Sequence, residues 1–310
     1  MLKNFLLQGI LIILFLPAFL FSSGYRRPGS TSAQFLKIGI SARAVAMGEA
    51  FTAVTEGAEA FFYNPAALAR LSSVDVFASH SSWFAGLNHE SFGVATGLKN
   101  KGTICLSFTT LYSDEMKVRT PLKPDGTGET FFCGNYRVGL SYAKFLTDRA
   151  ALGLSINYLN LRMWTYSVHS FSSDLGVFFQ TDFHGFRFGM AIENFGPDIK
   201  FINENYALPI NFSFGAAIEP IKNHRHTLTI AMNTIKATDA EQKLRLGMEY
   251  FYNDLITIRS GYKFGLDEES WSLGGGLKMI ISNFKLSIDY AYADFGILGS
   301  RNLFTLGLSF

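Results

Sequence analysis

The final stretch of the chain reads Arg301-Asn302-Leu303-Phe304-Thr305-Leu306-Gly307-Leu308-Ser309-Phe310. Side chains of a β-strand point alternately to the two faces of a sheet. One face of this stretch therefore carries Phe304, Leu306, Leu308 and Phe310. The opposite face carries only threonine, glycine and serine between them. The pattern predicts a strand with one apolar face and one small, polar face.

The same alternation recurs along most of the chain. Fourteen candidate strands cover residues 74–84, 90–98, 103–112, 135–145, 150–160, 171–180, 186–193, 209–219, 227–233, 242–250, 256–263, 271–280, 284–292 and 301–310. Their lengths suit strands that cross a bilayer at a tilt, and bacterial barrels have an even number of strands. The pattern predicts an all-β fold, a 14-stranded transmembrane outer-membrane β-barrel.

The connections between these strands differ in length on the two sides. Short connections cover residues 99–102, 146–149, 181–185 and 281–283, whereas longer ones cover 113–134, 161–170, 194–208, 234–241 and 293–300. Bacterial barrels have short periplasmic turns and long surface loops. The alternation therefore predicts that the even-numbered strands end at the periplasmic side.

The N-terminus has the composition of an export signal. Lys3 precedes an apolar run over residues 5–21, and small residues follow at 22–24. These features predict a cleaved signal peptide over residues 1–24. An uncleaved membrane helix is the alternative, because the run approaches spanning length. Together with the strand pattern, the signal predicts the outer membrane of a Gram-negative-type envelope, with its lipid as a partner.

Residues 25–72 differ from the rest of the chain. They are rich in alanine and contain few β-branched runs, and Asn64-Pro65 interrupts them. Proline is favoured in the first turn of a helix, so Pro65 is expected to start a short helix through Ala69. A segment of this kind does not suit a barrel wall. It predicts an N-terminal plug, or hatch, inside a barrel formed by residues 73–310.

Composition and motifs argue against several functional classes. The net charge of +2, without a basic stripe, argues against nucleic acid as a partner. The predicted topology places His80, His89 and the pair His224 and His226 at different heights, so they do not form one catalytic site. No third metal ligand lies near the last pair, and no cofactor motif is present. We expect that the chain is not an enzyme and binds no metal or cofactor. Composition alone also permits a soluble β-sandwich.

Two N-terminal motifs resemble the signature of the PorV/PorQ family. They read Ser41-Ala42-Arg43-Ala44-Val45-Ala46-Met47-Gly48-Glu49-Ala50-Phe51-Thr52-Ala53-Val54 and Tyr63-Asn64-Pro65-Ala66-Ala67-Leu68. The resemblance continues at residues 191–196, 246–250, 258–262 and 288–292. That family is related to the fatty-acid channel FadL, a fourteen-stranded barrel with an Asn-Pro-Ala motif in its hatch. The resemblance implies a hatch motif at Arg43, Met47, Gly48, Asn64, Pro65 and Ala66. Glu49 departs from the family pattern, which usually has a second glycine there.

The resemblance leaves two functions open. PorV-type members bind signal domains of secreted cargo and deliver them to a surface attachment complex of type IX secretion, which PorQ-type members accompany. FadL-like members transport hydrophobic small molecules. The first function implies partner binding by the long loops, with Phe295, Ile297 and Leu298 as candidates. The final strand, ending in Phe310, resembles the insertion signal read by barrel-assembly machinery.

Overall fold

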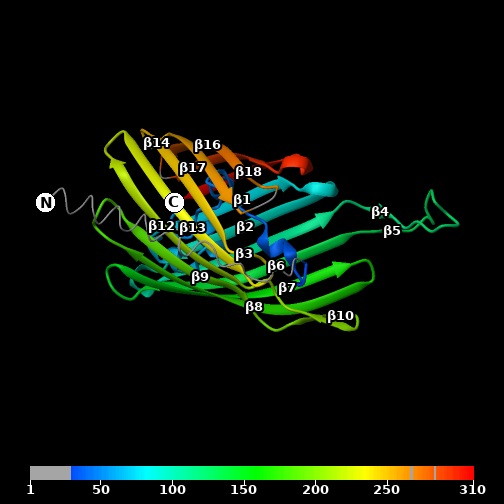
Figure 1. Ribbon diagram of the computed structural model, residues 1–310. Helices are drawn as coiled ribbons and strands as arrows, with labels where there is room; N and C mark the ends of the chain where they lie inside the picture. The colour runs from blue at the N-terminus through cyan, green and yellow to red at the C-terminus, as the bar shows by residue number, and fades with distance from the viewer. Residues whose placement is uncertain (1–28, 266–267, 283) are drawn as a thin grey trace.

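The computed structural model describes residues 29–265, 268–282 and 284–310, and its sheet is a closed antiparallel barrel (Figure 1). The predicted signal peptide lies outside the described residues. The fourteen wall strands are β1 (Val74–Ser82), β2 (Leu87–Gly97), β3 (Thr103–Ser113), β6 (Cys133–Phe145), β7 (Ala150–Met163), β8 (Tyr166–Gln180), β9 (Arg187–Phe195), β12 (Asn211–Lys222), β13 (His226–Ala237), β14 (Lys243–Tyr252), β15 (Ile256–Phe264), β16 (Trp271–Ile281), β17 (Phe284–Asp294) and β18 (Ser300–Ser309). The first strand pairs with the last, so the predicted fold is confirmed.

The predicted loop over residues 161–170 is wrong. Strands β7 and β8 continue through it, with Arg162 opposite Ser167, and only Trp164 and Thr165 separate them. The exposed outward residues here are Arg162, Ser167 and His169, all polar, so the apolar alternation that marks the rest of each strand is lost. Backbone pairing continues nevertheless, because it does not require an apolar face.

The two faces of the wall have the predicted chemistry. Outward positions such as Leu106, Leu140 and Leu154 leave about half of their side-chain surface exposed. The inward neighbours, such as Ser107 and Ser141, are buried. An apolar outer band and a polar interior are typical of barrels in a lipid bilayer. Separately, the described residues contain no helix with both the length and the apolar character needed to cross a membrane.

Replacing Leu306 with arginine is expected to destabilise the folded barrel by about 2–4 kcal/mol, because it places a charge on the outer apolar band. Leu306 is 53% exposed on the outer face of β18. Gly307→Ser is the control, because Gly307 faces inward and a new side chain would meet only the hydroxyl of Ser287, which can rotate. The fraction of protein that runs as heat-modifiable barrel on gels measures the effect of each of the two variants. Equal losses would contradict this assignment of the two faces.

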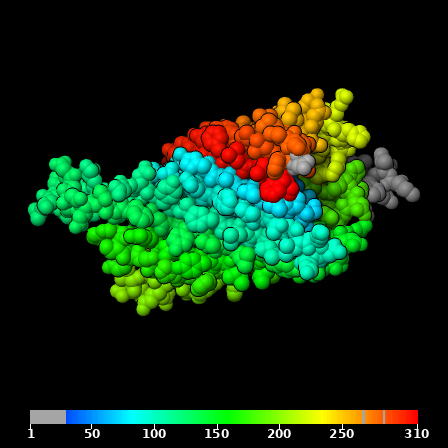
Figure 2. Space-filling model, turned by 180° about the vertical axis from the view of Figure 1, so that it is seen from behind, coloured from blue at the N-terminus to red at the C-terminus, as the bar shows by residue number. Residues whose placement is uncertain are grey.

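The longest connections lie at one end of the barrel. We call the end that carries Phe310 the C-terminal rim and the other end the hairpin rim. The hairpin rim carries two small sheets, β4 (Met116–Lys117) with β5 (Thr130–Phe131) and β10 (Ile199–Phe201) with β11 (Glu204–Tyr206) (Figure 1). Figure 2 shows the β4–β5 hairpin as a narrow projection beyond the barrel. This segregation matches the predicted loop pattern except at the β7–β8 turn and at residues 83–86, which are short connections at the hairpin rim.

The N-terminal segment lies inside the barrel. It contains η2 (Gln34–Lys37), α2 (Ala42–Ala46), η3 (Gly57–Phe62) and η4 (Pro65–Arg70), so the helix expected at Pro65 is present as a 3₁₀-helix. Phe61 and Leu68 of the segment are buried in one cluster with Phe77 and Phe178 of the wall. We call residues 29–73 the hatch.

Candidate functional site

The Met47-Gly48 motif lies against the main chain of the wall. Gly48 has a φ of 61°, and a Cβ atom there would lie 2.9 Å from the amide nitrogen of Tyr262. A Cβ atom on Gly261 of β15 would overlap the main chain of Met47 and Gly48. Only glycine permits such an approach on both sides. The motif therefore places the hatch turn directly on the wall.

The Asn64-Pro65 motif forms a second contact with the wall. The Asn64 side chain is fully buried, and its amide nitrogen donates to the carbonyl of Thr52 at 3.1 Å and to that of Val177 in β8 at 3.0 Å. Its oxygen accepts from the amide of Ala66 at 3.1 Å, which caps η4. Pro65 fills the first helical position, where no amide hydrogen is needed. One asparagine thus joins two parts of the hatch to the wall.

Arg43 connects the hatch to the wall by charge. Its Nε and Nη2 atoms donate to the two carboxylate oxygens of Glu249, both at 2.8 Å, and Nη1 donates to Glu56 at 2.7 Å. Arg259 contacts Glu249 at 2.7 Å and Asp289 at 2.5 Å. We call these five residues the buried ion cluster; Glu56 lies at its edge, with 44% of its side chain exposed. Alternation along the strands puts Glu249, Arg259 and Asp289 on the inner face, but the sequence does not show which of them Arg43 contacts.

Glu49 lies where the expected resemblance calls for a second glycine, and its backbone has a glycine-like conformation. Its φ is 58°, a region that side chains other than glycine rarely adopt. The carboxylate pairs with Arg245 at 2.6 Å and Lys263 at 3.3 Å. Burial raises the pKa of Glu49, but the two cations outweigh it and lower the pKa to about 2. The ion pairs with Arg245 and Lys263 thus stabilise the Glu49 carboxylate inside the barrel.

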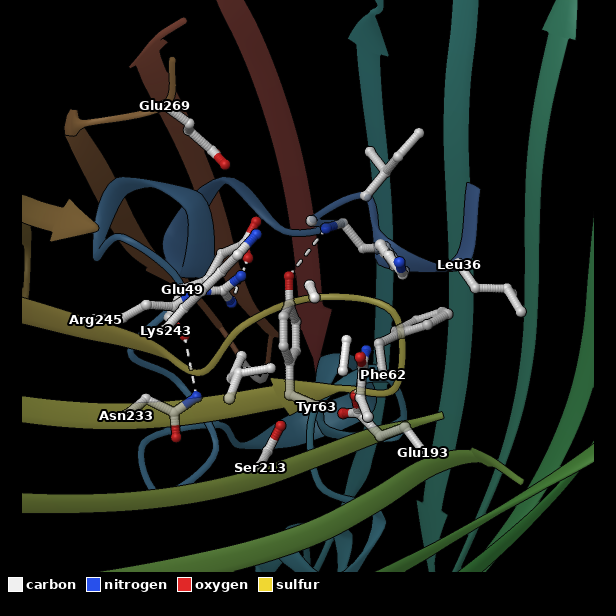
Figure 3. A pocket seen from close by; sticks show the side chains of 18 of the residues that line it. Leu36, Glu49, Phe62, Tyr63, Glu193, Ser213, Asn233, Lys243, Arg245 and Glu269 are labelled. Atoms are coloured by element: carbon white, nitrogen blue, oxygen red, sulfur yellow. Dashed lines mark hydrogen bonds and ion pairs between the residues drawn. The ribbon is translucent and has the colours of Figure 1, made fainter. Parts of the chain in front are cut away.

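A cavity of about 310 Å³ lies on the hairpin side of the hatch (Figure 3). Leu36 and Phe62 contribute apolar surface to it. Charged side chains line it on both sides, with Lys243 and Arg245 on one and Glu193 beside Phe62 on the other. The Tyr63 hydroxyl lies in the cavity wall and accepts hydrogen bonds from the amides of residues 40 and 41, at 2.9 and 3.1 Å. The cavity therefore offers both apolar and polar contacts to a small solute.

A second cavity, of about 410 Å³, lies on the C-terminal side of the hatch. Its lining includes Glu59 and Arg70 of the hatch, with Lys278 and Lys285 of the wall. Among the residues that the structure describes, the two cavities share no lining residue. The hatch thus separates two spaces within one lumen.

Raising the pH from about 5 to 8 is expected to weaken docking of the hatch at Glu59. Burial raises the pKa of Glu59 from 4.5 to about 7, although Arg43 and Ser41 act in the opposite direction. The docked state therefore binds more protons between those values, and its stability falls as the pH rises through them. Glu49 and Glu56 have lowered pKa values, so they titrate below this window.

Hydrogen exchange of the amides in residues 42–62 measures the effect. The wild-type protein is expected to exchange faster at pH 8 than at pH 5, after correction for intrinsic rates. The variant Glu59→Gln is expected to lose most of this difference. A pH dependence that persists unchanged in the variant would assign the effect to another group.

The loop and terminal candidates lie away from both cavities, with one exception. Ile297 is 88% and Leu298 56% exposed in η7 (Gly296–Leu298). Phe295 instead turns inward, where it lines the hairpin-side cavity and packs edge-on against Phe84, with ring centroids 5.0 Å apart. Phe310 is half exposed and packs against Phe284. Partner binding and insertion by these residues stay predictions.

The histidines do not converge on one site. His80 faces outward and contacts Glu90 at 3.4 Å, whereas His89 is buried on the inner face. His226 lies at the opposite rim and stacks on Tyr250. Within residues 29–265, 268–282 and 284–310, no group of three or more histidine, cysteine or acidic side chains has an arrangement suited to a metal.

Comparison with known proteins gives a match in structure only. No family model matches the chain, and no curated protein matches it in sequence. Among solved structures, the toluene transporter TbuX of Ralstonia pickettii matches with a TM-score of 0.57 and 13% identity, over 87% of this chain and 97% of its own. The toluene transporter TodX of Pseudomonas putida gives 0.55 and 11%, over 87% and 97%. A FadL homologue of Pseudomonas aeruginosa gives 0.54 and 12%, over 87% and 98%.

The chain has the fold of FadL-like outer-membrane barrels. The match covers almost the full length of these neighbours, so it includes the whole barrel and not one hairpin motif. This confirms the FadL-like part of the expected resemblance at the level of fold. At such low identity it establishes no shared substrate or partner.

Proposed function

We propose that the chain is an outer-membrane transporter of small, mainly apolar molecules. The observation that carries the proposal is the hatch, which divides the lumen of a closed barrel into two cavities. A barrel that only anchors other proteins does not need such a division. The hairpin rim faces the outside in this proposal, since long loops are typical of that side.

Three further observations support transport. The outer apolar band places the wall in lipid, and the solved neighbours include two toluene transporters. The hairpin-side cavity offers apolar surface at Leu36, Phe62 and Phe295, set among charged side chains, to a solute of this kind. Passage to the second cavity requires the hatch to shift. We therefore assign the gating step to the contacts of Asn64 and the buried ion cluster.

Uptake of radiolabelled toluene by cells with and without the chain tests the proposal. Wild-type protein is expected to raise the initial uptake rate over cells that lack it. Asn64→Ala removes the hydrogen bonds to Thr52 and Val177 and the cap of η4, each contributing about 1 kcal/mol. If movement of the hatch limits passage, this variant raises uptake several-fold.

The matched control is Asn223→Ala. Asn223 also binds main-chain amides, those of Arg225 and His226 at 3.0 and 2.8 Å, but in an exposed turn at the C-terminal rim. Its replacement is expected to leave uptake unchanged. Wild-type uptake no higher than that of cells without the chain would overturn the proposal.

A second candidate is the PorV/PorQ-type role in type IX secretion, with secreted cargo domains or attachment-complex proteins as partners. The projecting β4–β5 hairpin favours it, because its tip reaches well beyond the barrel and Leu122 there is 94% exposed (Figure 2). Replacing residues 114–131, or residues 293–300, with a Gly/Ser linker should then abolish recovery of cargo domains in pull-downs. Unchanged recovery after both replacements would count against this role.

A further inference from the structure

A groove on the outer wall has no role in either proposed function. It has a volume of about 810 Å³ and lies where the base of the β4–β5 hairpin meets β3, β6, β7 and β8. Its lining includes Tyr112, Phe131, Phe132, Tyr136, Arg162 and Trp164. Tyr136 faces outward, since its neighbour Arg137 is buried on the inner face. The groove therefore opens away from the lumen.

The groove begins where the apolar band ends. Phe108, Tyr136, Tyr158 and Phe171 form an aromatic row around the outer wall, with successive ring centroids 6.3, 6.2 and 5.5 Å apart. Aromatic girdles of this kind mark the level of the lipid head groups. Toward the hairpin rim from this row, the polar residues Thr110, Asn160 and Ser167 line the groove. The groove thus lies at head-group level on the hairpin side.

The lining combines aromatic faces with one unpaired cation. The guanidinium of Arg162 lies 4.6 Å from the ring centroid of Phe132, and no described carboxylate lies within ion-pair distance of it. Glu90, which contacts the lining residue Tyr112 at 3.0 Å, also contacts His80. Aromatic rings offer apolar faces, and an arginine fork suits phosphate oxygens. This lining suits a ligand with ring faces and anionic groups.

Trp164 lines the groove with a backbone conformation that is unfavourable for tryptophan. It lies in the turn between β7 and β8 with a φ of 54°, where glycine or asparagine is favoured. Its indole packs against Phe131 of the hairpin, with ring centroids 6.2 Å apart. A glycine in the same turn would remove this strain. The presence of tryptophan at this position is therefore explained by its contacts in the groove and not by the turn, which favours glycine.

We propose that this groove binds the sugar–phosphate head group of an outer-leaflet glycolipid. The aromatic rings stack on sugar rings, Thr110, Asn160 and Ser167 bond the hydroxyl groups, and Arg162 holds a phosphate. A glycolipid is favoured over a soluble ligand because the groove continues the lipid-facing surface at head-group level. The proposal rests on the outer-membrane placement and not on transport, so uptake measurements do not bear on it.

Native mass spectrometry of the full chain in detergent tests the proposal with two probes. These are lipid A carrying its phosphorylated core sugars, and phosphatidylglycerol. Wild-type protein is expected to bind the glycolipid at least about tenfold more tightly than the phospholipid. Arg162→Ala and Trp164→Gly are each expected to weaken glycolipid binding about tenfold. Dephosphorylation of the glycolipid should weaken binding by the wild type but not by Arg162→Ala.

Arg149→Ala is the matched control. Arg149 lies in the exposed turn between β6 and β7 at the C-terminal rim, where it pairs with Asp182. Its replacement removes the same charge from the opposite end of the barrel and should leave glycolipid affinity unchanged. Trp164→Gly is expected to fold, because glycine accepts the turn conformation, and heat modifiability checks this.

Three outcomes would overturn the proposal. One is equal affinity for the two lipids. Another is wild-type affinity in both groove variants. The third is complete displacement of the glycolipid by inorganic phosphate alone, which would indicate a simple anion site.

Discussion

Replacing Arg43 with methionine is expected to weaken docking of the hatch by about 3–5 kcal/mol, the usual cost of removing one partner from a buried ion pair, because Arg259 alone would then face the carboxylates of Glu249 and Asp289. Arg43 is 8% exposed and binds both oxygens of Glu249 as well as Glu56. Methionine retains much of the side-chain volume, so the loss is mainly electrostatic. Hydrogen exchange in residues 42–62 is expected to accelerate strongly while the barrel stays folded.

Arg70→Met in the same hatch is the control. Arg70 approaches Glu56 only at 3.9 Å, and its side chain is one-quarter exposed. Such a partly solvated pair contributes roughly 1 kcal/mol or less. A double variant, Arg43→Met with Glu249→Met, should recover part of the loss, because it removes both buried charges. Equal effects of Arg43→Met and Arg70→Met would show that the buried ion cluster does not hold the hatch.

Replacing Gly261 with valine is expected to expel the hatch turn from the wall, at a cost of about 3 kcal/mol or more. The new side chain would overlap the main chain of Met47 and Gly48. Because the overlapping atoms on the hatch side belong to the main chain, they cannot rotate away to relieve the overlap. The wall itself should tolerate the change, because valine is favoured in strands. Bilayer recordings are expected to show open-channel steps that the wild-type protein lacks.

Gly275→Val in the next strand, β16, separates this effect from damage to the barrel. A Cβ atom there would meet only the carbonyl of Thr257, at an ordinary 3.5 Å. That variant should fold and remain closed. If Gly261→Val also stays closed while its barrel is folded, the hatch turn is not what closes the lumen.

The sequence alone determined the wall of this protein. Alternation of side chains is a local property, so each strand could be located without knowing its neighbours. This way of locating strands failed at residues 161–170. There β7 and β8 extend beyond the apolar band, so the pattern no longer distinguishes strand from loop. The hatch could likewise be separated from the wall, because its alanine-rich composition does not suit a spanning strand.

Only the tertiary structure decided what the hatch and the groove contact. Arg43 and Glu249 are 206 residues apart, and nothing in either local sequence pairs them. Closing the barrel sets how the strands are staggered, and that stagger brings Glu249, Arg259 and Asp289 to one height opposite the hatch. The groove has the same origin, since it exists only where the β4–β5 hairpin meets β7 and β8. The local sequence pattern predicts the face of the sheet to which a side chain points. The residues that this side chain contacts depend on the register of the closed sheet.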